Sequence, residues 1–383
     1  MKVDSDFIAS MASKLIKINS ENPPGREGEI ASFVAERLSE LGFKAFVDKF
    51  GARANAVGIY RGAEGLRVLL VTHLDTVPAG RRESWRVPPF DGLMIDGRIY
   101  GRGAADAKGS LAAMLGAVKV LADEGWEIKG ELTLAAVADG EGDLRGIKRL
   151  FAKGVEADSA IIGEPTDLRV CIAQRGRLLL SVTFFGRSSH AGFPNLGTNA
   201  LHAASEFVLR LHDFSREFSE LHPLLGSPSI TPTVIIGGYG DNVIPEYVEV
   251  LVDRRVLPGE KVNNIVDFIG KIAEKIGEKI DVKTEIKVKK WIPPAEMRQD
   301  AEVVKKALRT VSKITGIRSE PAGFQGTCGM SFLVNEVKVP SVIFGPGDLK
   351  RAHAADEWVS VSELETAAKT YYTLISSLLK PEA

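Results

Sequence analysis

The sequence predicts an α/β protein in which a smaller α+β domain is inserted into a larger domain. Near both ends of the chain, short apolar runs alternate with amphipathic helical stretches, a pattern typical of a sheet covered by helices. A β-α-β-β-α-β unit lies mid-chain, an order typical of a ferredoxin-like domain. The 383 residues also exceed one ordinary domain of about 150 residues. We therefore place the larger domain at residues 1–177 and 293–383 and the inserted domain at 178–292.

The first part of the chain begins with two predicted helices. Asp4 and Asp6 lie early in MKVDSDFIASMASKLIKIN, whose apolar residues have helical spacing. A loop rich in Pro and Gly, NSENPPGREG, separates this helix from a second one over Glu29–Leu41, which Gly42 ends. The same periodicities then predict strands over Lys44–Phe50, Asn55–Tyr60, Val68–Thr72, Glu131–Ala136 and Ser159–Ile162, with helices over Leu111–Asp123 and Gly146–Ala152.

The inserted domain and the last part of the chain follow the same rules. In the inserted domain we expect strands over Leu178–Phe185, Thr233–Ile236, Tyr247–Arg254 and Asp281–Val288, with helices over Asn199–Phe214 and Val262–Ile276. After Trp291-Ile-Pro-Pro the α/β pattern resumes. It consists of a helix over Ala301–Ile314, a segment around Gly326–Phe332, a strand over Val339–Phe344 and a helix over Ser362–Leu379.

Charge and composition exclude several classes of partner. Lys and Arg total 49 and Asp and Glu total 50, so the net charge is −1 and we expect no nucleic-acid partner. The N-terminus lacks the basic start and unbroken apolar run of a signal peptide, and no apolar segment approaches the ~20 residues that span a bilayer. We therefore expect a cytoplasmic protein without a membrane partner. Cys171 and Cys328 are too few for a disulfide framework and are expected to be reduced thiols.

Most of the polar residues that can bind metals follow predicted strands, and Asp106 lies directly before a predicted helix. These candidates are His73, Asp75, Asp106, Glu141, Glu164 and His353. Taken singly, each resembles an ordinary surface residue, and Asp106 resembles a helix N-cap. Most of them, however, follow a strand of the same predicted sheet, and ligands of open α/β sheets gather at the carboxyl ends of strands. We therefore expect the group to converge on one site.

The chemistry of this group favours a pair of divalent cations. Two histidines and three carboxylates suffice for two metal ions if one carboxylate bridges them, and this mixture suits zinc, with cobalt or manganese as substitutes. Asp75 lies two residues after His73, so both face the same side of an extended segment. A carboxylate beside a metal-bound imidazole commonly fixes its tautomer, which is the role expected of Asp75.

Five motifs in order resemble a known family. They are THLDT, YGRGAADAKGSLAAM, the acidic loop after LAAVA, IIGEPT and AHAADEW. They resemble the dinuclear zinc deacylases and exopeptidases, which include succinyl-diaminopimelate desuccinylase, acetylornithine deacetylase, aminoacylase and the glutamate-releasing carboxypeptidase, and the match covers essentially the whole chain. The resemblance implies a mixed-sheet catalytic domain and an inserted lid and dimerisation domain. It also implies a homodimeric hydrolase that cleaves the amide bond of an N-acyl amino acid or short peptide.

The resemblance assigns roles to residues of the larger domain. It implies that His73 and Glu164 bind one metal, that Glu141 and His353 bind the other, and that Asp106 bridges the two. A cis peptide bond is implied between Asp106 and Ala107.

Further roles concern the substrate. GRSSHAGFPNLGTNA resembles the segment that presents a histidine, His190, to the oxyanion of the tetrahedral intermediate; in dimeric members this histidine comes from the neighbouring subunit. Asn242 and Arg255 match positions that bind the substrate's backbone and carboxylate, and Gly326 and Thr327 match a substrate loop. Arg255 favours a small-molecule substrate with a free carboxylate.

One position departs from the family pattern at the centre of its chemistry. The general base of the family is a Glu directly before the metal-binding Glu, and here that position is Gly140. Three explanations remain open. Asp139 or Asp143 takes the role from a shifted loop; Glu141 is the base while Asp143 supplies the ligand; or the protein binds metal and ligand with weakened turnover. Gly329, where many relatives carry an Asp, also puts the inherited specificity in question.

Overall fold

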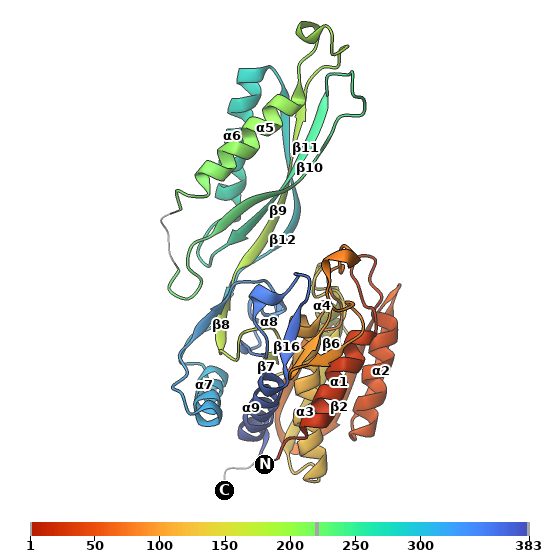
Figure 1. Ribbon diagram of the computed structural model, residues 1–383. Helices are drawn as coiled ribbons and strands as arrows, with labels where there is room; N and C mark the ends of the chain where they lie inside the picture. Colours follow the sequence, from red (N-terminus) through yellow and green to blue (C-terminus); the bar gives the residue numbers. More distant parts are fainter. Residues whose placement is uncertain (1, 219–221, 381–383) are drawn as a thin grey trace. The chain divides into compact units, whose positions relative to one another are not determined.

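The computed structural model describes residues 2–218 and 222–380. The chain forms two compact units, which we call unit 1 (Met1–Gln174 and Glu296–Ala383) and unit 2 (Arg175–Ala295). Each unit contains its own sheet and helices (Figure 1). The domain boundaries expected from the sequence, after Arg177 and after Ile292, lie a few residues from these limits.

Unit 1 contains most of the predicted strands and helices. Its helices are α1 (Ser5–Lys17), α2 (Glu27–Glu40), α3 (Gly109–Asp123), α4 (Arg145–Ala152), α7 (Glu302–Thr315), α8 (Met330–Asn335) and α9 (Val361–Leu379). Its strands are β1 (Lys44–Phe50), β2 (Arg53–Arg61), β3 (Ala63–His73), β4 (Leu93–Ile95), β5 (Arg98–Tyr100), β6 (Lys129–Val137), β7 (Ser159–Ile162), β8 (Cys171–Gln174), β14 (Ala322–Phe324), β15 (Ser341–Ile343) and β16 (Trp358–Ser360). The two-residue strand β13 (Ala295–Glu296) lies where the units join in sequence.

The large mixed sheet places several strand ends on one edge. Its strand order is β1-β2-β6-β3-β7-β15-β8-β13, with β14 beside β8. Strands β6, β3, β7 and β15 are parallel to one another, so their carboxyl ends lie on the same side. Consecutive residues of β3 from Val68 to His73 are buried, which shows that both faces of this strand are covered.

The helices that cover this sheet follow their sequence signals. Helix α3 is buried along nearly its whole length, as its almost continuous run of small and apolar residues requires. Helix α9 begins with a capping box in which Ser360 and Glu363 satisfy each other's backbone N–H groups. Two predicted strands, Lys44–Phe50 and Ser159–Ile162, have the observed bounds.

Several short strands were not predicted. Strands β4, β5, β8, β14 and β16 have three or four residues each. Strand β4 pairs with the adjacent β5, whereas β5, β8, β14 and β16 also pair with strands that are distant in sequence. The segment expected around Gly326–Phe332 is a loop followed by the short helix α8. Local periodicity does not reveal such elements, because they depend on tertiary pairing.

Unit 2 has the predicted ferredoxin-like order. Its elements are β9 (Gly176–Phe185), α5 (Ala200–Phe214), β10 (Ser229–Gly237), β11 (Tyr247–Val256), α6 (Val262–Ile280) and β12 (Lys283–Ile292). The strands form an antiparallel sheet in the order β10-β11-β9-β12. Alternate residues of β11, such as Val248, Val250 and Val252, enter the core with residues of both helices, so one face of the sheet carries the helices.

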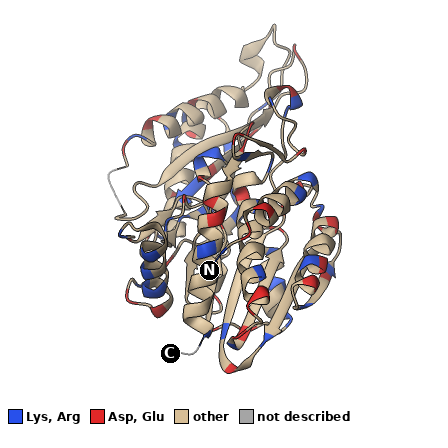
Figure 2. Ribbon diagram, turned by 60° about the horizontal axis from the view of Figure 1, so that its bottom comes forward, with Lys and Arg blue, Asp and Glu red and all other residues tan. Residues whose placement is uncertain are grey.

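Surface composition agrees with the balanced charge of the sequence. Basic and acidic residues are mixed along the helices (Figure 2). Both cysteines are buried free thiols, as expected. Among residues 2–218 and 222–380, no helix combines the length and the hydropathy that a transmembrane segment needs.

Candidate metal centre

The candidate ligands of unit 1 meet at the carboxyl edge of its large sheet. His73 is the last residue of β3, and Glu164 follows β7 closely. Glu141 lies in the loop after β6, and His353 lies in the segment between β15 and β16. These parallel strands bring residues that are far apart in sequence to one place, as expected for open α/β sheets.

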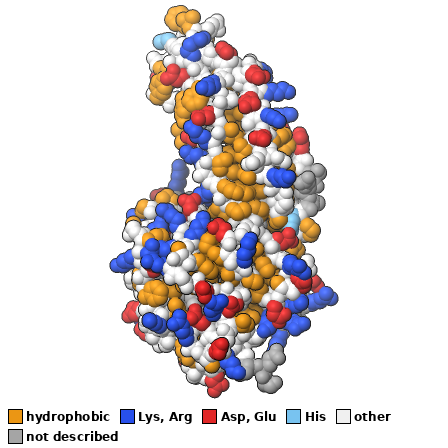
Figure 3. All heavy atoms as spheres, turned by 180° about the vertical axis from the view of Figure 1, so that it is seen from behind, with side chains coloured by type: hydrophobic (Ala, Val, Ile, Leu, Met, Phe, Trp, Pro, Cys, Tyr) orange, Lys and Arg blue, Asp and Glu red, His pale blue; other side chains and the backbone are white. Residues whose placement is uncertain are grey.

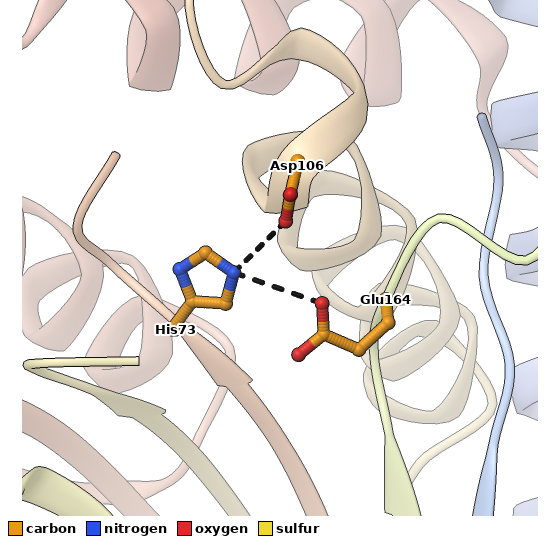
Figure 4. A group of neighbouring side chains, drawn as sticks. All are labelled: His73, Asp106 and Glu164. Carbon is orange, nitrogen blue, oxygen red and sulfur yellow. Dashed lines mark hydrogen bonds and ion pairs between the residues drawn. The ribbon is translucent and has the colours of Figure 1, made fainter. Parts of the chain in front are cut away.

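His73, Asp106 and Glu164 form the first group. The Nε2 atom of His73 lies 3.1 Å from Oδ1 of Asp106 and 3.7 Å from Oε2 of Glu164. All three side chains are buried and converge on one point (Figure 4). Each offers one ligand atom, and these atoms lie within 4.8 Å of one another, close enough to bind a common ion.

The second group consists of Asp106, Glu141 and His353. Nε2 of His353 lies 3.3 Å from Oδ2 of Asp106 and 3.0 Å from Oε1 of Glu141. Asp106 therefore directs one oxygen toward each group, the geometry that a bridging carboxylate needs. The peptide bond between Asp106 and Ala107 is cis, as the resemblance implies.

Each of these groups perturbs the protonation of the others. Burial raises the pKa of Glu164 to about 7, and the nearby carboxylates of Asp106 and Glu141 act in the same direction. Burial opposes a charged ring in His353, but hydrogen bonds with Asp106 and Glu141 outweigh it and raise the pKa of His353 to about 10. Carboxylates also raise the pKa of His73 well above its ordinary value, against the effect of burial. The metal-free cluster therefore holds protons where cations would bind.

Asp75 fixes the surroundings of His73 in two ways. Its backbone carbonyl lies 2.8 Å from Nδ1 of His73, closer than its carboxylate oxygen at 3.6 Å. If Nδ1 donates to that carbonyl, Nε2 remains available as a ligand. The Asp75 carboxylate accepts hydrogen bonds from the backbone N–H groups of Gly140 and Glu141 at 2.8 and 3.1 Å. Asp75 thus connects His73 of one group to the loop that carries Glu141 of the other.

Gly140, in the loop after β6, lies directly against the side chain of His73. A Cβ atom added at Gly140 would lie 2.4 Å from Cβ of His73, far closer than van der Waals contact. Gly329, the other departure from the family pattern, lines the same small pocket as Gly140, beside His73 and Glu164. A Cβ atom at Gly329 would lie 2.9 Å from Cδ1 of Ile147. Neighbouring side chains thus crowd both positions.

The carboxylate of Asp139 is engaged elsewhere. It is buried and pairs with Arg145 at 2.7 Å and with Arg53 at 3.1 Å, and it accepts a hydrogen bond from Asn22. Burial alone would raise the pKa of Asp139, but these contacts outweigh it and lower the pKa below its ordinary value. A carboxylate held in this way is a poor proton acceptor.

The structure places the remaining predicted residues in both units. Gly326 and Thr327 lie between β14 and α8 of unit 1. In unit 2, Nδ1 of the exposed His190 accepts the N–H of Gly192 at 3.0 Å, and the carbonyl of Asn242 accepts the N–H of the residue after His190. Arg255 forms an ion pair with Asp253, and Asp253 also pairs with Arg177, which lies opposite Arg255 on the neighbouring strand.

Two residues near the centre were missed by sequence reasoning. Asn22 donates hydrogen bonds to the carboxylates of both Asp75 and Asp139, and its only sequence signal is its place in the Pro/Gly loop. Glu357 accepts the backbone N–H groups of Ala105 and Asp106. It lies within the AHAADEW motif, so the motif itself was its available signal.

The donor set fits two divalent cations. Three carboxylates, those of Asp106, Glu141 and Glu164, share a small partly buried volume, where their mutual repulsion calls for positive charge. Imidazole and carboxylate together suit zinc and its common substitutes.

Comparisons with known proteins agree with this geometry. Residues 69–377 match the model of peptidase family M20/M25/M40. The chain is 30% identical to a succinyl-diaminopimelate desuccinylase of Nitrosospira multiformis over 97% of this chain and 98% of the relative. It is 32% identical to an acetylornithine deacetylase of Myxococcus xanthus over 88% of each.

A solved structure shares the fold. The YXEP protein of Bacillus subtilis, a dinuclear metal-binding peptidase of the M20 family, superposes with a TM-score of 0.70 at 17% identity and 97% coverage of both chains. The chain therefore belongs to peptidase family M20/M25/M40, and with its deacylase relatives this makes it a metal-dependent hydrolase.

Proposed function

We propose that this protein hydrolyses the amide bond of an N-acyl amino acid or short peptide that carries a free carboxylate. The observation that carries the proposal is the position of Asp106, whose two oxygens face two separate groups of ligands. The reactions named for the desuccinylase and deacetylase relatives support the substrate class. Unit 1 would be the catalytic domain and unit 2 the lid.

Five side chains would hold the metals, with zinc as the first candidate. His73 and Glu164 would bind one ion, Glu141 and His353 the other, and Asp106 both. Two divalent ions, when bound, would acidify a water molecule and polarise the substrate carbonyl. Asp75 would fix the position of the His73 ring relative to the loop that carries Glu141, since it contacts both.

Residues of unit 2 would act on the substrate. Because Nδ1 of His190 accepts a backbone N–H, the neutral ring carries its proton on Nε2. A donor of this kind can stabilise the oxyanion of a tetrahedral intermediate. Arg255, which pairs with Asp253, would bind the substrate carboxylate, because a planar guanidinium matches a carboxylate with two parallel hydrogen bonds. Asn242 would bind the substrate backbone. In unit 1, Gly326 and Thr327 would belong to a substrate loop.

A second candidate function is a weakened relative that binds metals and substrate but turns over slowly. Asp139 is fully engaged with arginines, and Glu141 rather than Asp143 stands in a ligand group. At Gly140 a side chain would collide with His73, so the position of the family's general base is not suited to a Glu. These observations favour a metal centre without that base. We infer a rate lower than that of typical relatives by on the order of 10²–10⁴-fold, the usual contribution of general acid–base catalysis.

We also propose a homodimer formed through unit 2. Hydrophobic side chains are visible on the surface of this unit (Figure 3). Val234, Ile235 and Ile236 on the edge strand β10 are 41%, 51% and 56% exposed. An apolar edge strand of this kind is suited to pairing with a second copy.

The test of the proposed reaction is the release of primary amine from N-acetyl, N-succinyl and dipeptide substrates. Protein loaded with zinc or cobalt is compared with protein treated with EDTA. Turnover that requires metal supports the hydrolase and identifies its substrate class. If protein shown to hold two metals releases no amine from any substrate, the weakened relative is the better description.

A further inference from the structure

Glu357 is a fully buried acid that lies beside the candidate metal centre. It is 1% exposed and lies four positions after His353, directly before β16. One carboxylate oxygen, Oε1, accepts the backbone N–H groups of Ala105 and Asp106 at 2.9 and 3.0 Å. The side chain therefore holds the peptide units that present the bridging carboxylate of Asp106.

The other oxygen of Glu357 is held just as firmly. Oε2 accepts from Nη1 of Arg102 at 2.6 Å, and Arg102 is itself 2% exposed and packs over the ring of Trp85. Arg102 also donates to the carbonyl of Ala354, next to His353. A charge-assisted hydrogen bond between buried partners is short and directional, so it restricts where the carboxylate of Glu357 can lie.

The backbone of Glu357 adds a further connection. Its carbonyl accepts the N–H of Gly101 at 2.9 Å, which extends the β5–β16 ladder beyond the pair Trp358 and Tyr100. Glu357 thus contacts residues 101, 102, 105 and 106 of the turn that carries Asp106. Glu357 also lies only four residues after His353, in the same short segment before β16.

We propose that Glu357 is a positioning residue that sets the spacing between Asp106 and His353. These two side chains belong to the same ligand group, with Glu141, and reach it from separate segments of the chain. Glu357 joins those segments through its side chain and its backbone. Withdrawal of its carboxylate from the backbone N–H groups of Ala105 and Asp106 weakens binding of the metal shared by Asp106 and His353 more than binding of the metal beside His73 and Glu164.

The experiment is a titration of metal-free protein with Zn²⁺ against a chromophoric chelator, with Co²⁺ absorption spectra as a second readout. Glu357→Asp keeps the charge but withdraws the carboxylate by one methylene. Glu357→Gln keeps an acceptor oxygen of the same reach and removes the charge. Partners outside the ligand shell typically change metal affinity 10–100-fold, so we expect a loss of that size in Glu357→Asp at the site that Asp106 shares with His353. Glu357→Gln should fall between this variant and the unmodified protein.

Leu121→Ala serves as the control for general loss of stability. Leu121 is fully buried toward the end of α3 that is remote from Asp106 in sequence, so this variant lowers the melting temperature without touching the turn. The proposal is overturned if Glu357→Asp binds both ions like the unmodified protein, or loses affinity only as Leu121→Ala does.

This inference rests on the proposed metal centre, which the same titration tests separately. Unmodified protein that fails to bind two ions removes the proposed function itself. Two ions in unmodified protein and no selective loss in the Glu357 variants remove only the inference.

Discussion

Gly140→Glu would put the family's general base back at its usual position, and we predict that it does not restore activity. The added Cβ atom would lie 2.4 Å from Cβ of His73, whereas carbon atoms in contact are about 3.5–4.0 Å apart. Overpacking of this kind costs about 1–3 kcal/mol. If the strain falls on His73, the affinity for the metal that His73 binds should fall about 5- to 150-fold, because each 1.4 kcal/mol changes a binding constant about tenfold.

The assay for this prediction is zinc affinity measured by chelator competition, together with amine release at saturating zinc. Gly28→Glu is the matched control, because a Cβ atom at Gly28 meets nothing within 4 Å. The control should bind zinc like the unmodified protein. Activity raised about 100-fold by Gly140→Glu with zinc affinity unchanged would refute the reasoning, since it would show that the loop accommodates the missing side chain.

Three further predictions follow from the site and from unit 2. Asp106→Ala removes the carboxylate common to both ligand groups and should abolish binding of both metals in a zinc titration; unchanged metal content would contradict the assignment. The raised pKa of His353, about 10, means that zinc must displace its proton at neutral pH, so apparent affinity should rise with pH up to that value. Calorimetry in buffers of different ionisation enthalpy should detect proton release, and an affinity that is flat between pH 6 and 8 would be inconsistent with it. Ile236→Asp should convert the proposed dimer to a monomer in light scattering after gel filtration, whereas Ile317→Asp on unit 1, where Ile317 is 72% exposed, should not; a dimer that survives Ile236→Asp argues against the β10 interface.

Much of the site could be predicted because its ligands follow strong strand signals. His73 and Glu164 lie at or just after the ends of apolar runs that form buried strands. Because these two strands are neighbours in the sheet, the two side chains lie close together. The ferredoxin-like order of unit 2 was also readable, since each of its elements is long enough to show its own periodicity.

Other features depend on contacts that the sequence does not display. The nearest partner of Nδ1 in His73 is a backbone carbonyl, and backbone positions leave no residue-specific signal. The crowding of Gly140 arises because β3 and β6 are neighbours, which brings His73 against the loop. Strand β16 has only three residues and exists through its pairing with β5, so the AHAADEW motif pointed to Glu357 but not to its place beside Asp106.

The most direct test of the central claim is a crystal structure of zinc-loaded protein with anomalous data at the zinc edge. We predict two anomalous peaks per chain, one beside His73 and Glu164 and one beside Glu141 and His353, with Asp106 touching both. A single peak, or peaks remote from Asp106, would contradict the dinuclear centre proposed for this chain.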